Sequence, residues 1–408
     1  MNIGIIDADL ISRKRHRFPN LACMKIAGYY KSKGHNVFLL LSYKDIETYD
    51  KVFISKVFTD TEIDENILKM DNVEYGGTGF YYDKAKPLPY EIEHSFPFYD
   101  LYNDFINKQI ENGISEKEFD YYKKYSIGFT TRGCFRGCEF CVNKNSRKVV
   151  KHSELSEFVD SSRPYICLLD DNILGYSKCY EVFEELSNTN KRFQYKQGMD
   201  ERVLNDKKCK MISEANLIGS VYFAFDNIED KDTIIEKMKL MRRYTEKIFS
   251  FYVLCAFDRN EKYDLEFWRK DIIDTFERIN ILKELNCRPY IMRYEKYKES
   301  PFYGIYTALA SWCNQPQFFK KMTFREFCVK KGINSKCYKK YKDDPYLDKY
   351  RKRYQNLYKT ACDNPTSKSA ILYEKYKKEG AIKTDLYKKG LITGDELIKW
   401  VESMRVNK

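Results

Sequence analysis

The sequence predicts an α/β protein: a partial, parallel (β/α)6 barrel with a small N-terminal Rossmann-like α/β domain and a helical, basic C-terminal segment. Three observations lead to this fold class. The chain opens with a strand, helix, strand, strand pattern. Apolar runs and polar, helix-like segments then alternate from residue 125 to about 295. After residue 300 the alternation stops and Lys and Tyr dominate. We expect domains at 1–120, 121–300 and 301–408.

In the first domain, apolar runs predict three strands, at residues 2–6, 35–41 and 51–55. Between the first two, residues 20–33 carry apolar side chains on one helical face, and Gly34 is a typical helix stop. Residues 73–100 hold three glycines and three prolines, which predict a loop that links the two domains. The charged stretch 101–124 is predicted to be helical.

Six apolar runs predict the barrel strands: 126–130, 165–169, 193–196, 220–225, 249–256 and 289–293. The segments between them predict helices at 153–161, 176–190, 206–216, 229–245 and 264–286. Six such steps are two short of a complete eight-fold barrel.

A cysteine motif directly follows the first barrel strand. Cys134, Cys138 and Cys141 are spaced C-x3-C-x2-C within a single loop. Three thiolates on one loop can hold a [4Fe–4S] cluster and leave its fourth iron open, and Gly133 and Gly137 allow the backbone to wrap tightly. The alternative is zinc, which needs four ligands, usually in two pairs. The sequence has no second C-x2-C and only four histidines.

The motif TTRGC-x3-C-x-F-C resembles that of the radical S-adenosylmethionine (SAM) superfamily, and especially that of the branch of tRNA methylthiotransferases and cobalamin-dependent enzymes. The resemblance implies that Cys134, Cys138 and Cys141 bind a [4Fe–4S] cluster whose open iron chelates SAM. It implies reductive cleavage of SAM to a 5′-deoxyadenosyl radical that abstracts hydrogen, with flavodoxin or ferredoxin as electron donor. It also places Phe140 near the adenine.

Polar residues at later strand ends extend the resemblance. The resemblance implies that seven residues contact SAM or the substrate: Asp171, Asn172, Gln197, Asp200, Arg202, Asp226 and Tyr252. A barrel places its chemistry at these ends. The alternative is that these residues are helix caps and turn formers.

The N-terminal half also resembles a group of radical SAM proteins from gut bacteria and their mobile elements, which offers no substrate. The shared segments are Phe18–Ile26, Ser55–Phe58, Gly76–Gly79 and Pro87–His94. Cobalamin-dependent relatives often carry D-x-H-x-x-G in this domain, and this sequence does not, so we expect no cobalamin. Methylthiotransferases need three further N-terminal cysteines, whereas only Cys23 precedes the motif.

The net charge of +12 is concentrated at the C-terminal end. Residues 320–408 contain 24 Lys and Arg against 11 Asp and Glu. The segment Lys336–Arg353 alternates basic residues with Tyr, a pattern that can bind phosphates and stack bases. The alternative is a solvated helix face on a Lys-rich chain.

The leading functional hypothesis is a radical SAM enzyme that acts on an unknown substrate, RNA or a nucleotide-like molecule among the candidates. One alternative is a cobalamin-dependent radical SAM methyltransferase. Another is a non-enzymatic iron–sulfur or zinc protein that binds nucleic acid. The sequence has no apolar run near the ~20 residues needed to span a membrane and opens without a signal-peptide pattern, so we expect a cytoplasmic protein with no membrane partner.

Overall fold

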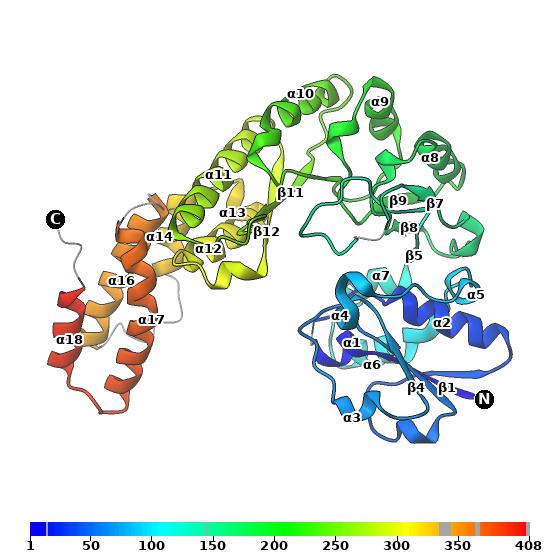
Figure 1. Cartoon of the computed structure of the whole chain (residues 1–408), viewed down its shortest axis with the longest axis horizontal. Coiled ribbons are helices and arrows are strands. Elements are labelled where there is room, and N and C mark those ends of the chain that lie inside the picture. Colours follow the sequence, from blue (N-terminus) through cyan, green and yellow to red (C-terminus); the bar gives the residue numbers. More distant parts are fainter. Residues whose placement is uncertain (14, 144–145, 334–343, 364–367, 405–408) are drawn as a thin grey trace. The chain divides into compact units, whose positions relative to one another are not determined.

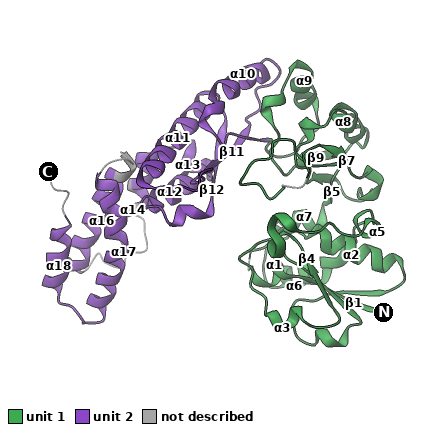
Figure 2. Cartoon of the chain, viewed as in Figure 1, with its two compact units in different colours: residues 1–221 green, residues 222–408 purple. Residues whose placement is uncertain are grey.

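The computed structural model describes residues 1–13, 15–143, 146–333, 344–363 and 368–404. These residues form a mixed α/β structure that divides into two units, residues 1–221 and 222–408 (Figure 2). The predicted boundary at residue 120 lies inside the first unit, and the observed division falls inside the predicted barrel domain. The three-domain division therefore stays a prediction.

The first unit opens with a parallel four-stranded sheet of order β2-β1-β3-β4. Figure 1 labels its strands β1 and β4. Its strands are β1 (Asn2–Asp7), β2 (Asn36–Leu39), β3 (Lys51–Ser55) and β4 (Val73–Gly76). Its helices are α1 (Ala8–Ser12), α2 (Leu21–Ser32), α3 (Glu65–Leu68), α4 (Thr78–Tyr81), α5 (Tyr90–Glu93), α6 (Asn103–Glu111) and α7 (Asp120–Lys123). The three predicted strands and the first predicted helix are confirmed. Asn20 starts α2 by accepting a hydrogen bond from the Cys23 amide.

The prediction that residues 73–100 form only loop is wrong. The segment contains the strand β4 and the short helices α4 and α5. β4 is an edge strand that pairs only with β3 among the described strands, and its central residues Glu74 and Tyr75 are exposed. It therefore lacks the run of apolar residues that marks a buried strand in a sequence.

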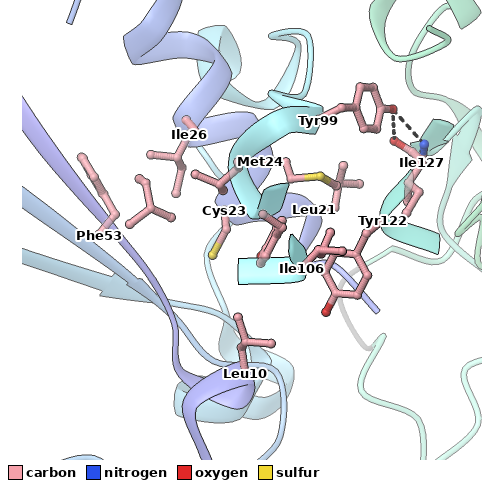
Figure 3. Close-up of a cluster of buried hydrophobic side chains, with 14 of the residues drawn as sticks. Leu10, Leu21, Cys23, Met24, Ile26, Phe53, Tyr99, Ile106, Tyr122 and Ile127 are labelled. Atoms are coloured by element: carbon pink, nitrogen blue, oxygen red, sulfur yellow. Dashed lines mark hydrogen bonds between the residues drawn. The ribbon is translucent and has the colours of Figure 1, made fainter. Parts of the chain in front are cut away.

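A continuous apolar core joins this sheet to the next part of the unit (Figure 3). Side chains from α2, such as Met24, pack with Ile106 of α6 and with Ile127 of the following strand. The Tyr99 hydroxyl receives a hydrogen bond from the Ile127 amide at 2.8 Å and donates one to the Phe158 carbonyl at 2.6 Å. The N-terminal sheet and the strand that leads to the cysteine motif thus share one core.

The second sheet of the first unit is parallel, with the order β5-β8-β9. Its elements are β5 (Tyr125–Gly128), β8 (Tyr165–Leu168) and β9 (Arg192–Tyr195), with α8 (Cys179–Asn188) and α9 (Asp206–Glu214). The predicted helix 153–161 is wrong: only a single 3-10 turn, Leu155–Glu157, forms there. Phe158 is buried, and its carbonyl accepts the bond from Tyr99, so this backbone group serves a tertiary contact rather than a helix.

The second unit holds a parallel sheet of order β10-β11-β12 and a helical C-terminal part. Its strands are β10 (Tyr222–Ala224), β11 (Ser250–Cys255) and β12 (Arg288–Arg293). Its helices are α10 (Lys231–Arg242), α11 (Leu265–Glu284), α12 (Tyr303–Cys313), α13 (Pro316–Phe319), α14 (Phe324–Ile333), α16 (Pro345–Asp363), α17 (Lys368–Lys388) and α18 (Gly394–Ser403). Of the predicted basic segment, residues 336–343 lie outside the described residues, and the remainder forms the start of α16.

All six predicted barrel strands exist within a few residues of their predicted bounds. They form two three-stranded sheets, one in each unit. A continuous (β/α)6 barrel therefore stays a prediction. None of the helices in the described ranges is long and apolar enough to cross a membrane.

Candidate functional site

The cysteine motif lies in a loop that a short antiparallel ribbon closes. β6 (Thr131–Arg132) pairs with β7 (Val150–Lys151), immediately after β5. Inside the ribbon, the Cys134 amide donates to the Ser146 carbonyl at 3.2 Å. The loop is therefore fixed at both ends, although its three cysteines lie in irregular backbone.

Two glycines give this loop its backbone path. Gly133 and Gly137 have φ angles of 98° and 61°, a region that favours glycine. A Cβ atom at Gly133 would lie 2.0 Å from the carbonyl oxygen of Lys148. Gly133 therefore meets both a conformational and a steric requirement.

Asp170, which follows β8, holds the start of the loop. Its carboxylate accepts four hydrogen bonds of 2.5–3.0 Å, from the amides and hydroxyls of Thr130 and Thr131. The side chain is buried, and burial raises the pKa of Asp170 while the four hydrogen bonds act against that rise. Such a saturated, buried carboxylate is a rigid anchor for the residues that precede the cysteines.

The next two residues extend this anchor. Asp171 accepts a hydrogen bond from the Gly133 amide at 2.7 Å and lies 3.5 Å from Nε of Arg132. The side-chain amide of Asn172 donates to Sγ of Cys134 at 3.4 Å. Three consecutive residues after β8 thus hold three successive parts of the cysteine loop.

The segment after β9 also contacts the cysteine loop. Its partner in the loop is Arg136, which lies between the first two cysteines. Nε of Arg136 contacts Oδ2 of Asp200, and Nε of Arg202 contacts Oδ1 of the same carboxylate at 2.9 Å. Burial acts to raise the pKa of Asp200, but the two guanidinium groups lower it. Asp200 is therefore an ionised group that links the segment after β9 to the loop.

The three motif cysteines differ from the other described cysteines in exposure. Cys134, Cys138 and Cys141 are partly exposed, whereas the eight other cysteines whose side chains the structure describes are buried. Sγ of Cys141 accepts a hydrogen bond from the Asn143 amide at 3.4 Å, as Cys134 does from Asn172. Accessible sulfurs that accept N–H bonds are typical of thiolate ligands.

The described residues contain no group of three or more His, Cys, Asp or Glu side chains that could hold a single metal ion. A four-iron cluster differs from a single ion, because each thiolate binds a different iron. The residues present fit such a cluster: three partly exposed cysteines lie on one loop, with N–H donors to the sulfurs of two of them. In addition, the buried Oδ1 of Asn172 has no hydrogen-bond partner among the described residues.

The remaining predicted site residues are divided between the two units. In the first unit, Gln197 is exposed and the Phe140 carbonyl accepts a hydrogen bond from the Tyr82 hydroxyl at 3.3 Å. In the second unit, Asp226 accepts from the Leu254 amide at 3.0 Å, and the Tyr252 ring stacks on Tyr222 with centroids 4.7 Å apart. Their role as SAM contacts stays a prediction.

Sequence reasoning did not select two residues that hold the loop, Asp170 and Arg136. Asp170 could have been found, because it is an acidic residue at the end of an apolar strand. Arg136 lies inside the motif, but its sequence position gives no sign of its partner 64 residues away. Asp171, Asn172, Asp200 and Arg202 were selected as ligand contacts, and the structure brings all four to the cysteine loop or its anchor.

No family model and no curated protein matches the chain. Among solved structures, the chain is similar to a radical S-adenosylmethionine methyltransferase, TsrM, from Kitasatospora setae, with cobalamin and a [4Fe-4S] cluster bound. The two share 12% identity over 72% of each chain, with a TM-score of 0.45. A likeness at this identity and TM-score shows neither a shared fold nor a shared activity.

Proposed function

We propose that this protein is a radical SAM enzyme. The observation that carries the proposal is the C-x3-C-x2-C loop, whose partly exposed cysteines are anchored at the carboxyl ends of β8 and β9. Cys134, Cys138 and Cys141 would hold a [4Fe–4S] cluster. When bound, the cluster supplies one electron that splits SAM into methionine and a 5′-deoxyadenosyl radical, which takes a hydrogen atom from the substrate.

The residues around the loop have separate tasks in this proposal. Asp170 and Asp171 fix the backbone before Cys134, and Asn172 donates to its sulfur. Arg136 brings a fixed positive charge between the first two cysteines. The reduction potential of a bound cluster would depend on this charge and on the N–H bonds to the cluster's thiolates.

For SAM itself we propose contacts from Phe140, Asp171, Asn172, Gln197, Asp200 and Arg202, all of the first unit. The contacts expected of Asp226 and Tyr252, which belong to the second unit, stay predictions. The free Oδ1 of Asn172 supports its place in this set, because a buried acceptor without a donor favours an incoming ammonium group. Flavodoxin or ferredoxin would deliver the electron. The absence of cobalamin remains a prediction, and a cobalamin-dependent methyltransferase would be identified by copurifying cobalamin.

The test is anaerobic purification, reconstitution with iron and sulfide, reduction, addition of SAM, and mass spectrometry of 5′-deoxyadenosine. We expect the wild type to form this product and Cys138→Ala to lose both the product and the cluster absorbance. Cys209→Ala is the matched control, because Cys209 is buried on α9 of the same unit and should keep both signals. A fully loaded cluster without product, with or without candidate RNA, would favour the non-enzymatic iron–sulfur protein.

A further inference from the structure

The second unit contains a cavity of about 540 Å³ that the cysteine chemistry does not use. It lies among α12, α14, α16 and α17, and α16 and α17 lie side by side in Figure 1. Its volume falls within the range of about 300–1,000 Å³ that small-molecule sites occupy. The cavity is lined by the helical C-terminal part, where the positive charge of the sequence is concentrated.

Tyrosine rings form one wall of the cavity. Tyr350, Tyr354 and Tyr358 follow each other at four-residue spacing along α16, so they share one helix face. Tyr373 of α17 completes the wall, and its hydroxyl lies 2.9 Å from that of Tyr354. Tyr358 and Tyr373 are buried, whereas Tyr350 and Tyr354 are half-buried. The half-buried pair offers aromatic surface against which a planar group can stack.

Positive side chains form the rest of the lining. Lys331, Arg351, Lys377 and Lys388 line the cavity, against a single acidic lining residue, Asp385. Lys377 is half-buried, and burial lowers the pKa of its ammonium group. Asp348 pairs with Arg351, and Glu374 lies near Lys377, so these two carboxylates offset part of the positive charge. Lys331, Lys377 and Lys388 still leave the lining positive, and an anion bound beside Lys377 would favour its charged form.

Two polar side chains of α16, Arg351 and Gln355, limit the class of ligand further. The guanidinium group of Arg351 is oriented by Asp348 at 2.7 Å and by Oε1 of Gln355 at 2.9 Å. The amide Nε2 of Gln355 is buried and has no acceptor among the described residues. An amide donor beside aromatic rings fits the hydrogen-bonding edge of a planar, polar molecule better than a hydrocarbon.

We infer that this cavity binds a nucleotide, with the base against the α16 tyrosines and the phosphate near Lys377. The ligand chemistry is an anionic phosphate joined to a planar heterocycle, which either a free nucleotide or a single-stranded nucleic acid can present. The inference is independent of the proposed radical chemistry, because it rests on residues of α12, α14, α16 and α17 alone.

The test measures binding to the full-length protein by equilibrium dialysis. The probes are the four ribonucleoside monophosphates, adenosine, inorganic phosphate and a short single-stranded RNA. We expect a monophosphate or the RNA to bind, and adenosine and phosphate to bind at least about tenfold more weakly because each supplies half of the contacts. Binding of a monophosphate identifies a free nucleotide as ligand, and binding of the RNA alone identifies a strand.

Two variants locate the binding in the cavity. Lys377→Ala should weaken it at least about tenfold, and Ala381→Trp should abolish it by filling the space that Ala381 lines. The matched controls are Lys375→Ala and Ile382→Trp, since both residues are exposed on α17 and neither lines the cavity. Circular dichroism checks that the variants fold. Binding that both cavity variants leave unchanged, or no binding of any probe by the wild type, would overturn the inference.

Discussion

The side-chain amide of Asn172 donates a hydrogen bond to Sγ of Cys134 over 3.4 Å, across 38 residues of sequence. An N–H bond to a cluster thiolate stabilises the reduced state, which carries more negative charge. In the proposed enzyme, Asn172→Leu should therefore lower the reduction potential of the cluster, on the order of tens of millivolts. A redox titration followed by electron paramagnetic resonance measures this shift.

The control for this substitution is Asn188→Leu, at the exposed end of α8. Its potential should equal that of the wild type, and both variants should bind the wild-type amount of iron. An unchanged potential in Asn172→Leu would mean that the contact with Cys134 does not tune the cluster.

Gly133 and Gly113 of the first unit separate two reasons for a glycine, a positive φ angle and a lack of space for a Cβ atom. Both have positive φ angles, 98° and 87°. A Cβ at Gly133 would lie 2.0 Å from the Lys148 carbonyl, whereas nothing lies within 4 Å of a Cβ at Gly113. Gly113→Ala should cost only the left-handed strain of about 1 kcal/mol. Gly133→Ala should also displace the loop and lose most of the iron.

Iron content after reconstitution, together with thermal unfolding, checks both variants. If Gly133→Ala bound as much iron as Gly113→Ala, the close approach to Lys148 would not determine the shape of the cysteine loop.

The sequence predicts most of the strands well because their runs of apolar residues are the residues that the fold buries. Ile166 and Cys167 of β8, for example, are fully buried. It does not predict β4, since exposed Glu74 and Tyr75 leave no such run. It also cannot predict which strands pair, so six correctly predicted strands did not imply one continuous sheet.

For the site, local spacing was enough to select the three cysteines, because the motif is contiguous in the chain. The anchoring contacts depend on residues far apart in sequence, such as Arg136 with Asp200 and Thr130 with Asp170. Polar residues at strand ends indicate that a site is near, but not whether each one contacts a ligand or the protein itself.

Asp170 should be important for stability as well as for the loop. Asp170→Ala removes the acceptor for four hydrogen bonds from Thr130 and Thr131 and leaves buried donors unpaired. We expect a loss of roughly 3 kcal/mol in the free energy of unfolding, measured by urea denaturation, and reduced iron binding. Glu184→Gln, on the exposed face of α8, is the control and should change neither. A fully stable Asp170→Ala would show that Thr130 and Thr131 find other partners.

Asp7, at the end of β1, should make the first unit sensitive to pH. Burial raises the pKa of Asp7 from 3.8 to about 7, although hydrogen bonds from the Tyr102 hydroxyl at 3.0 Å and the Leu10 amide at 3.3 Å act against the rise. Between these pH values the folded state binds more protons than the unfolded state. The contribution of Asp7 is therefore fully present below about pH 4 and is lost as pH rises through 7.

The change Asp7→Asn mimics the protonated acid and should remove this dependence. Relative to the wild type, Asp7→Asn should become more stable as pH rises from 5 to 8. The gain in the free energy of unfolding has an upper limit of roughly 4 kcal/mol, which is the whole pH-dependent contribution of Asp7. His16, whose pKa burial lowers, has its Nε2 3.9 Å from Oδ2 of Asp7. The comparison is therefore repeated in a His16→Gln background, which separates the titration of His16 from that of Asp7. Hydrogen exchange of the β1 amides, measured during a urea titration at each pH, reports on the first unit alone. Asp71→Asn, at an exposed residue, is the control. Equal slopes of stability against pH in Asp7→Asn and wild type would mean that Asp7 is already ionised in the folded protein at pH 5.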